Sequence, residues 1–280
     1  MNKLTLMFPG FKTKAFTMSF DDGHDSDIPL AKLLLKYDLK GSFNLCAGEL
    51  YPEGAEVPVS PHGHRPMTEK EALELLSDPH FEIVSHGYHH EAVGHVPTSE
   101  ALYDMLMDRR RLEELFDTFV TGHVYPYGSY SKGAIECAKL CGFKYARLAQ
   151  RDTSFLLPEE DTWYVWKPTA HFLEGDFDEL LDRFIKLNNN YYHGKVFYAW
   201  GHSFEFIHKW DLIEEKLKKI SGREDFWYST NGELYNYVKA YRSLEYNADT
   251  TKVYNPTQID VYVRHDNGSV CVHAGETVKF

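Results

Sequence analysis

Short runs of β-branched and aromatic residues alternate with helical hydrophobic patterns along most of the chain. The runs predict strands at residues 15–20, 42–46, 82–85, 123–125, 145–148, 163–166, 195–200 and 226–228. Amphipathic patterns predict helices at residues 28–35, 102–119, 132–141, 177–184, 212–220 and 234–244, and a capping box at 68–71 opens a further short helix. This alternation predicts an α/β fold, a deformed (β/α) barrel of about seven parallel strands.

The pattern changes after Asn247. Apolar residues then follow an alternating pattern, at Val253, Ile259, Val261, Val263, Val270, Val272 and Val278. Alternation is typical of antiparallel strands with one buried face. We therefore expect a barrel over residues 1–247 and a small β appendage over residues 248–280 that packs on it. Such an appendage could close the barrel against a second copy, so a homo-oligomer is one arrangement to consider.

Composition narrows the class of protein. The 280 residues are 43% hydrophobic and 15% aromatic, which is too apolar for a disordered chain. A net charge of −12 argues against a nucleic-acid partner and against attachment to an anionic membrane. No apolar run reaches the roughly 18 residues of a transmembrane helix. The N-terminal segment also lacks the features of a signal peptide, so we expect a cytoplasmic protein whose four cysteines are reduced.

Reactive side chains follow the predicted strands. Asp21 and Asp22 close the first strand, and His86 and His90 follow the third. Because the carboxyl ends of barrel strands meet at one mouth, these residues should converge there. One carboxylate and two imidazoles form the ligand set of a hydrolytic zinc site, and the second carboxylate is then free to act as a base. Taken singly, the aspartates could cap a helix and the histidines could be structural.

Four strand ends together resemble the motifs of the polysaccharide deacetylases of the NodB-homology type, carbohydrate esterase family 4. The family's T/S-F-D-D motif is similar to Ser-Phe-Asp-Asp at 19–22, and its H-S/T-x-x-H motif to His-Gly-Tyr-His-His at 86–90. Tyr-Pro-Tyr-Gly at 125–128 looks like a variant of the third motif, and Ala-Trp-Gly-His at 199–202 corresponds to the last. The resemblance covers residues 15–203 and says nothing specific about the appendage.

Two departures from the family pattern concern how the site is held. Gly87 stands where the family has a hydroxyl residue that braces the loop, so the loop needs another support here. The third motif has no arginine in the usual place to orient the base. Arg147, at the end of the following strand, is our candidate substitute; an ordinary structural arginine is the alternative.

The resemblance implies a mechanism. Asp22, His86 and His90 would hold a divalent metal, with zinc as the first candidate. Asp21 would act as the base toward water activated by the metal, and His202 would protonate the departing amine. The backbone N–H of Tyr127 would stabilise the oxyanion. The substrate would be an N-acetylated glycan or oligosaccharide.

Two other interpretations stay open. Relatives of these deacetylases hydrolyse small cyclic amides or ureides on the same fold, which suits a cytoplasmic enzyme. A carbohydrate-binding pseudoenzyme would require the loss of a catalytic or ligand residue, and all five are present. Tyr125, Pro126 and Trp166 are further candidates for substrate binding, with Trp166 as a stacking surface for a sugar ring.

Overall fold

The computed structural model describes residues 4–187, 194–265 and 268–280. Its centre is a sheet of parallel pairs in which neighbouring strands follow the order β6-β5-β4-β3-β2-β8-β7, and β9 also pairs with β2. The strands are β2 (Lys14–Asp22), β3 (Gly41–Leu45), β4 (Phe81–Ser85), β5 (Gly122–Val124), β6 (Tyr145–Arg147), β7 (Ala170–His171), β8 (Lys195–Gly201) and β9 (Phe226–Ser229).

Strand β2 is the axis of this sheet. All of its residues but the last are buried, the polar ones at Thr17, Ser19 and Asp21 included, so it lies in the interior of the fold. It pairs with β8 along one side, whereas on the other side its first residues pair with β9 and its last residues with β3. This change of neighbour departs from the closed ring of a regular barrel. The predicted deformed (β/α) barrel is therefore confirmed.

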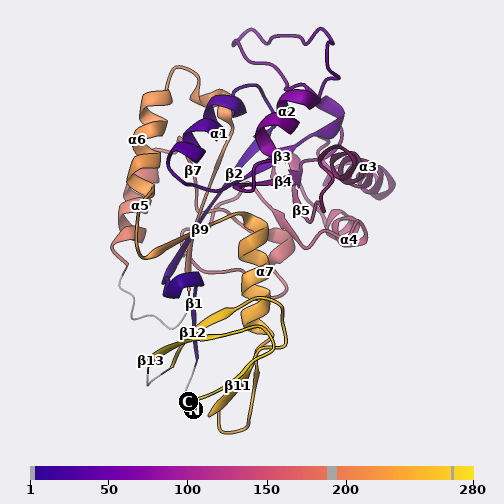
Figure 1. Cartoon of the computed structure of the whole chain (residues 1–280). Helices are drawn as coiled ribbons and strands as arrows, with labels where there is room; N and C mark the ends of the chain where they lie inside the picture. Colours follow the sequence, from indigo (N-terminus) through magenta and orange to yellow (C-terminus); the bar gives the residue numbers. More distant parts are fainter. Residues whose placement is uncertain (1–3, 188–193, 266–267) are drawn as a thin grey trace.

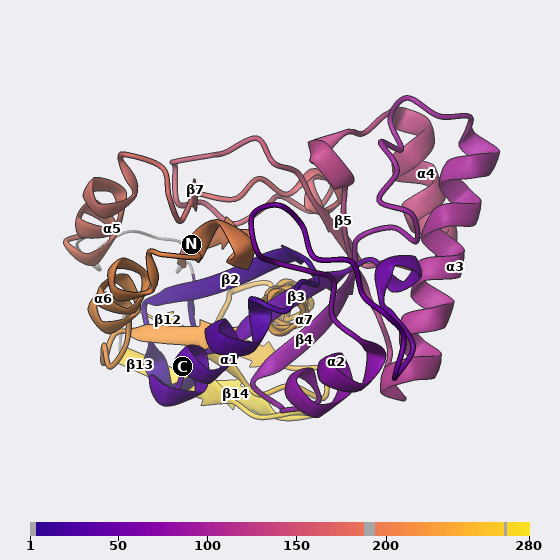
Figure 2. The ribbon, with the colours of Figure 1, turned by 90° about the horizontal axis from the view of Figure 1, so that it is seen from above.

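Helices surround the strands when the barrel is viewed from above (Figure 2). They are α1 (Asp27–Lys36), α2 (Glu69–Leu76), α3 (Thr98–Phe116), α4 (Lys132–Leu140), α5 (Phe177–Ile185), α6 (Trp210–Ile220) and α7 (Asn231–Arg242). Thr68 completes both halves of the predicted capping box of α2, and Thr230 forms the same arrangement at the start of α7. Short 3-10 helices follow several strands, among them η2 (Ala47–Glu49), η3 (Pro126–Gly128) and η5 (Ser203–Phe206).

Two short elements differ from the sequence prediction. The aromatic run at 163–166 forms the 3-10 helix η4 (Trp163–Val165), and only Trp166 makes a single bridge to Arg147. Aromatic residues favour strands because they pack well on a sheet, but Trp163 is buried here against other aromatic rings without a strand. Strand β7 was not predicted, because two residues are too short to show any alternation.

Small antiparallel sheets lie below the barrel in Figure 1, next to both chain ends. One pairs β1 (Thr5–Met7) with β12 (Val261–His265) and β13 (Gly268–Val272). The other joins β10 (Glu245–Tyr246), β11 (Lys252–Tyr254) and β14 (Thr277–Lys279). Strands β1 and β10 thus complete sheets whose other strands lie in the predicted appendage, and the boundary at residue 248 stays a prediction.

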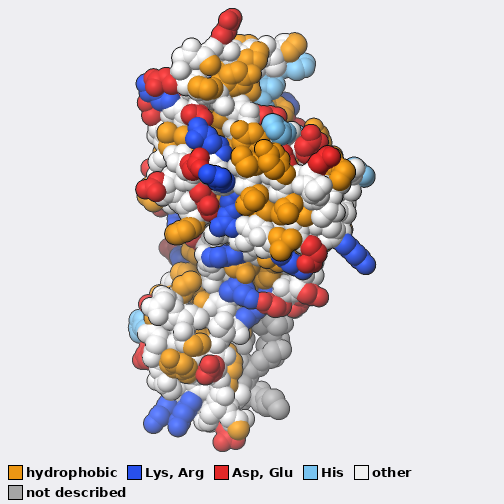
Figure 3. All heavy atoms as spheres, turned by 90° about the vertical axis from the view of Figure 1, so that its right-hand side faces the viewer, with side chains coloured by type: hydrophobic (Ala, Val, Ile, Leu, Met, Phe, Trp, Pro, Cys, Tyr) orange, Lys and Arg blue, Asp and Glu red, His pale blue; other side chains and the backbone are white. Residues whose placement is uncertain are grey.

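The surface of the molecule is mixed in charge. On the face that α3 and α4 cover, acidic and basic side chains are interspersed (Figure 3), despite the net charge of −12. Across the described residues, no helix combines the length and the apolar character that crossing a membrane requires. Cys46, Cys137 and Cys141 are buried and Cys271 is half-buried, and all four are free thiols, as expected.

Candidate active site

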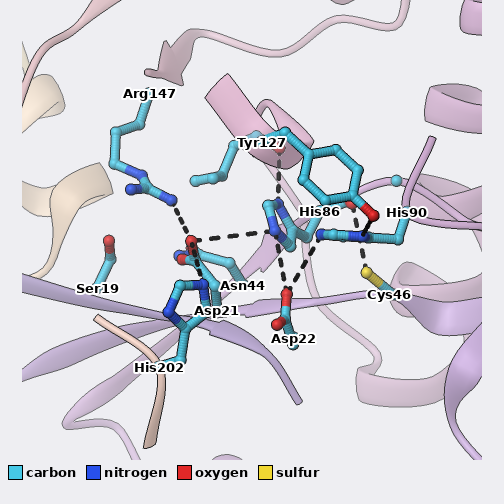
Figure 4. Close-up of polar contacts among 12 residues, drawn as sticks. Ser19, Asp21, Asp22, Asn44, Cys46, His86, His90, Tyr127, Arg147 and His202 are labelled. Atoms are coloured by element: carbon cyan, nitrogen blue, oxygen red, sulfur yellow. Dashed lines mark hydrogen bonds and ion pairs between the residues drawn. The ribbon is translucent and has the colours of Figure 1, made fainter. Parts of the chain in front are cut away.

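Asp21, near the end of β2, is held by partners from other strands (Figure 4). Its Oδ2 accepts a hydrogen bond of 2.5 Å from Arg147 Nη2, and its Oδ1 accepts one of 2.6 Å from Asn44 Nδ2. Burial alone would raise the pKa of Asp21, but the charge of Arg147 and of the nearby histidines lowers it. Asp21 is therefore an oriented and ionised carboxylate, and Arg147 occupies the position expected of an orienting residue.

Asp22, the next residue, faces two histidines instead. Its Oδ1 lies 3.3 Å from Nε2 of His86 and 3.4 Å from Nε2 of His90. The three ligand atoms all lie within 4.8 Å of one another. Although burial would raise the pKa of Asp22, the neighbouring His86 imidazole lowers it well below its usual range. The sequence predicted that these three residues converge, and the structure brings them together.

This donor set fits a divalent metal ion. Asp22 Oδ1 is buried and accepts no hydrogen bond of good geometry from the described residues, so a ligand atom is left without a partner. His86 donates from Nδ1 to the Val124 carbonyl at 2.8 Å, which leaves its Nε2 free to bind a cation. His90 Nδ1 lies 3.1 Å from Tyr127 Oη. A carboxylate and two oriented imidazoles suit zinc or another first-row ion.

Three residues of the candidate site have a strained backbone. Asp22, His90 and Tyr127 have φ angles of 83°, 53° and 58°, in the left-handed region that side chains other than glycine rarely adopt. Each such residue costs on the order of 1–3 kcal/mol, which the surrounding contacts must offset. Strain of this kind on two of the three ligand residues and on the predicted oxyanion donor is typical of a functional site.

His202 follows β8 on the other side of Asp21. Its Nε2 lies 3.9 Å from Asp21 Oδ2, and its Nδ1 lies 3.1 Å from Glu205 Oε2. The same Glu205 oxygen lies 2.8 Å from His171 Nε2. Burial would lower the pKa of His202, but Glu205 and the two aspartates raise it to about 8. A protonated imidazole therefore lies beside Asp21, opposite the candidate metal ligands.

The structure corrects the prediction that the side chains of Tyr125, Pro126 and Trp166 bind the substrate, because all three are buried. Trp166 is 3% exposed and packs against Trp163, Tyr145 and Tyr198, because its main chain bridges β6 and turns the ring into the core. Tyr125 is 1% exposed and Pro126 is also buried. These side chains therefore offer no face to a sugar ring. Of the third-motif side chains, Tyr127 is the exposed one, and Trp200 is half-buried beside Arg147.

The sequence analysis missed several partners of these groups. Asn44 holds Asp21 from a strand of apolar residues, and Glu205, in η5, pairs with His202. His171 lies on the short strand that was not predicted. The pairing register of β2 and β3 places Asn44 directly opposite Asp21, so a correct register would have found this residue. No sequence pattern of its own marks Glu205 or His171.

Comparison with known proteins supports this picture. Residues 10–146 match the family described as polysaccharide deacetylase, and no curated protein matches the sequence. The putative polysaccharide deacetylase of Mycobacterium smegmatis superposes with a TM-score of 0.59 and 14% identity, over 85% of this chain and 94% of that one.

Two other solved structures match less closely. The Streptococcus pyogenes deacetylase PplD, in complex with acetate, matches with a TM-score of 0.43 and 18% identity. That match covers 48% of this chain and 56% of PplD, little more than half of its length. The Bacillus anthracis pseudoenzyme BA3943 matches with a TM-score of 0.48 and 18% identity, over 81% of this chain and 66% of that one.

The Mycobacterium match shows a shared fold, and the family match spans the barrel from β2 into β6 with the first three motifs. The predicted resemblance is confirmed: residues 10–146 match the polysaccharide deacetylase family, and the chain shares its fold with the Mycobacterium structure.

Proposed function

We propose that the chain is a metal-dependent hydrolase that removes N-acetyl groups from an N-acetylated glycan or oligosaccharide. The observation that carries this proposal is the division of roles between two adjacent carboxylates. Asp22 lies with two imidazoles and accepts no hydrogen bond from the described residues, whereas Asp21 is oriented by Arg147 and Asn44. Metal-assisted amide hydrolysis uses a cation site together with an ionised base, and this mouth offers candidates for both side by side.

Asp22, His86 and His90 would hold the ion, which when bound would polarise the acetamido carbonyl and lower the pKa of water. Asp21 takes a proton from the attacking water, because its lowered pKa keeps it ionised and Arg147 fixes its orientation. The backbone N–H of Tyr127, in the tight turn η3 beside His90, donates to the oxyanion.

His202 completes the reaction from the opposite side of Asp21. Glu205 holds its Nδ1, so Nε2 is the atom that delivers a proton to the departing amine nitrogen. Water adds to the acyl carbon, the C–N bond breaks, and the products are acetate and a free amino sugar. The pKa of about 8 keeps His202 protonated at neutral pH, as an acid catalyst requires.

Acetate release from a panel of N-acetylglucosamine oligosaccharides tests this proposal. The zinc-loaded protein should release acetate, and a chelator should stop the release. Asp21→Asn should lower the rate by about 10²–10⁴-fold, the usual contribution of a general base, without loss of the bound ion. The Asn variant is the matched control, because it keeps the shape of the side chain.

Other outcomes point to the alternatives. Zinc binding without acetate release would overturn the proposal that the substrate is an N-acetylated glycan. It would favour hydrolysis of a small cyclic amide or ureide, and such compounds would be the next substrates to test. Absence of zinc binding in the folded protein would overturn metal-dependent catalysis altogether. Carbohydrate binding measured by calorimetry would then favour the hypothesis of a carbohydrate-binding pseudoenzyme.

A further inference from the structure

The loop that carries His86 and His90 is held by two carboxylates of helix α3. Asp108 Oδ2 accepts hydrogen bonds from the backbone N–H groups of His86 and Gly87, both at 3.1 Å. Asp104 accepts from the next two, with Tyr88 N at 3.0 Å and His89 N at 2.8 Å. Four successive N–H groups of the loop thus point at two side chains that lie one helical turn apart.

The opposite side of the loop rests on the segment after β3. Asp108 Oδ1 accepts a hydrogen bond of 2.7 Å from Ala47 N, so one carboxylate ties η2 and the loop to the same helix. Gly48 N also donates to the Tyr88 carbonyl at 3.1 Å. The loop is therefore clamped between α3 and η2.

Gly87 is part of this arrangement. Its φ of 82° lies in the left-handed region, and a Cβ at this position would lie 2.6 Å from Asp104 Oδ2. A side chain here would displace the Asp104 carboxylate from its present position against the loop. The two carboxylates therefore supply the support that the sequence lacks at position 87.

We propose that Asp104 and Asp108 are positioning residues that fix the two histidines for cation binding, a role that rests on the proposed metal site. Successive backbone N–H groups that point the same way form an anion-binding nest, and here protein carboxylates occupy it. His86 N donates to the Leu45 carbonyl at 2.9 Å as well as to Asp108, and its Nδ1 is held by the Val124 carbonyl, so both the main chain and the ring of this residue are fixed. Groups of this kind behind a ligand typically change metal affinity by about 10–100-fold.

Zinc affinity of Asp108→Asn and Asp104→Asn, measured by competition with a chromogenic chelator, tests the proposal. An amide keeps one acceptor oxygen but places an NH₂ group opposite a backbone N–H that had donated a hydrogen bond to the carboxylate. Each variant should bind zinc about 10–100-fold more weakly than the wild type. The visible spectrum of bound Co²⁺ should also change, because the imidazoles are no longer held in one orientation. The matched control is Glu114→Gln, an exposed acid on the same helix that pairs with Arg110.

Unchanged zinc affinity and an unchanged Co²⁺ spectrum in the folded Asn variants would overturn the proposal, even if the wild type binds zinc. A wild type that binds no zinc would instead remove the proposed function on which this inference rests. If Asp108→Asn does not fold, as judged by circular dichroism, Asp104→Asn becomes the test. Asp104 accepts hydrogen bonds from two loop amides but, unlike Asp108, from no residue of η2 among those the structure describes. Hydrogen exchange of the metal-free wild type adds a readout without any variant. The amides of residues 86–89 should exchange slowly, and rapid exchange would also overturn the clamp.

Discussion

The barrel holds a half-buried carboxylate at each end, and the two differ in their partners. At the floor, Glu82 of β4 accepts hydrogen bonds from Ser42 Oγ at 2.8 Å, Tyr145 Oη at 2.9 Å and Gly232 N at 2.8 Å. At the mouth, Asp22 Oδ1 accepts none of good geometry from the described residues and faces two imidazole nitrogens instead.

This difference separates a structural group from a ligand-binding one. Exposure does not distinguish the two, since both side chains are half-buried. The donors around Glu82 come from β3, β6 and the start of α7, so the carboxylate joins the floor of the barrel to the helix beneath it. Asp22 Oδ1, by contrast, has no hydrogen-bond partner among the described residues, so this oxygen is available to a cation.

The largest expected effect comes from removing the mouth carboxylate. Asp22→Ala should weaken zinc binding by more than the roughly 100-fold that loss of a supporting group costs, because it deletes a ligand itself. The metal-free protein should lose some stability, because the His86 imidazole lowers the pKa of Asp22 and so stabilises its charge, but no hydrogen-bond network comparable to that of Glu82 is broken among the described residues. Chelator competition and urea unfolding without metal measure the two effects. A large loss of metal-free stability would break the comparison.

The floor carboxylate should behave in the opposite way. Glu82→Ala leaves the donors from Ser42, Tyr145 and Gly232 without their acceptor, which should cost on the order of 1–3 kcal/mol in the free energy of unfolding. Zinc affinity should stay at the wild-type value, because the contacts of Glu82 lie at the other end of the strand. Glu82→Gln, which keeps one acceptor oxygen, should cost less. Urea unfolding and chelator competition on the same samples check both statements, and a joint loss would contradict them.

The strands of the barrel could be predicted because their burial is visible in the sequence. β8 is largely buried and has an almost continuous apolar run, and β2 keeps apolar residues at Ala15, Phe16, Met18 and Phe20, whereas β7 has two residues and leaves no pattern. The run at 163–166 was wrongly predicted as a strand, because burial of Trp163 gives the same signal in a 3-10 helix. Local composition thus identifies what is buried more reliably than the backbone form.

The candidate site divides in the same way. Asp22, His86 and His90 could be found because each lies at a strand end within a recognisable motif. The groups that support them could not, because Asp104 and Asp108 lie in a charged helix where acidic residues are common. Their function depends on which face of α3 meets the loop, and that is a tertiary contact.

A third test concerns a mouth carboxylate that does have partners. Glu205 raises the pKa of His202 to about 8 against the opposing effect of burial, so kcat/KM should fall as the pH rises through about 8. In Glu205→Gln this alkaline limb should move toward the ordinary value of 6.5. The same raised pKa contributes to stability below pH 6.5, and this contribution is lost as the pH rises through about 8. A pH profile with the limb unmoved would exclude Glu205 as a partner of the acid.

The smallest effect is expected at Glu71, in the first turn of α2. Its carboxylate accepts hydrogen bonds from Thr68 N at 2.8 Å and Arg65 Nη1 at 2.8 Å, so it resembles Glu82 in having its partners in place. Glu71→Gln should cost about 1 kcal/mol in unfolding free energy and leave zinc affinity unchanged.

The pH dependence of this stability cost follows from the lowered pKa of Glu71. The side-chain hydrogen bond from Arg65 lowers the pKa of Glu71 from 4.5 to about 2, so its contribution is complete above pH 4.5 and is lost as the pH falls through about 2. The difference between wild type and Glu71→Gln should therefore be full at about pH 6 and smaller at about pH 3, as measured by urea unfolding. A cost that grows with acid would mean that the carboxylate is not paired in the folded state. Loss of zinc binding in Glu71→Gln would mean that hydrogen-bond partners alone do not distinguish a structural carboxylate from a metal ligand at this end of the barrel.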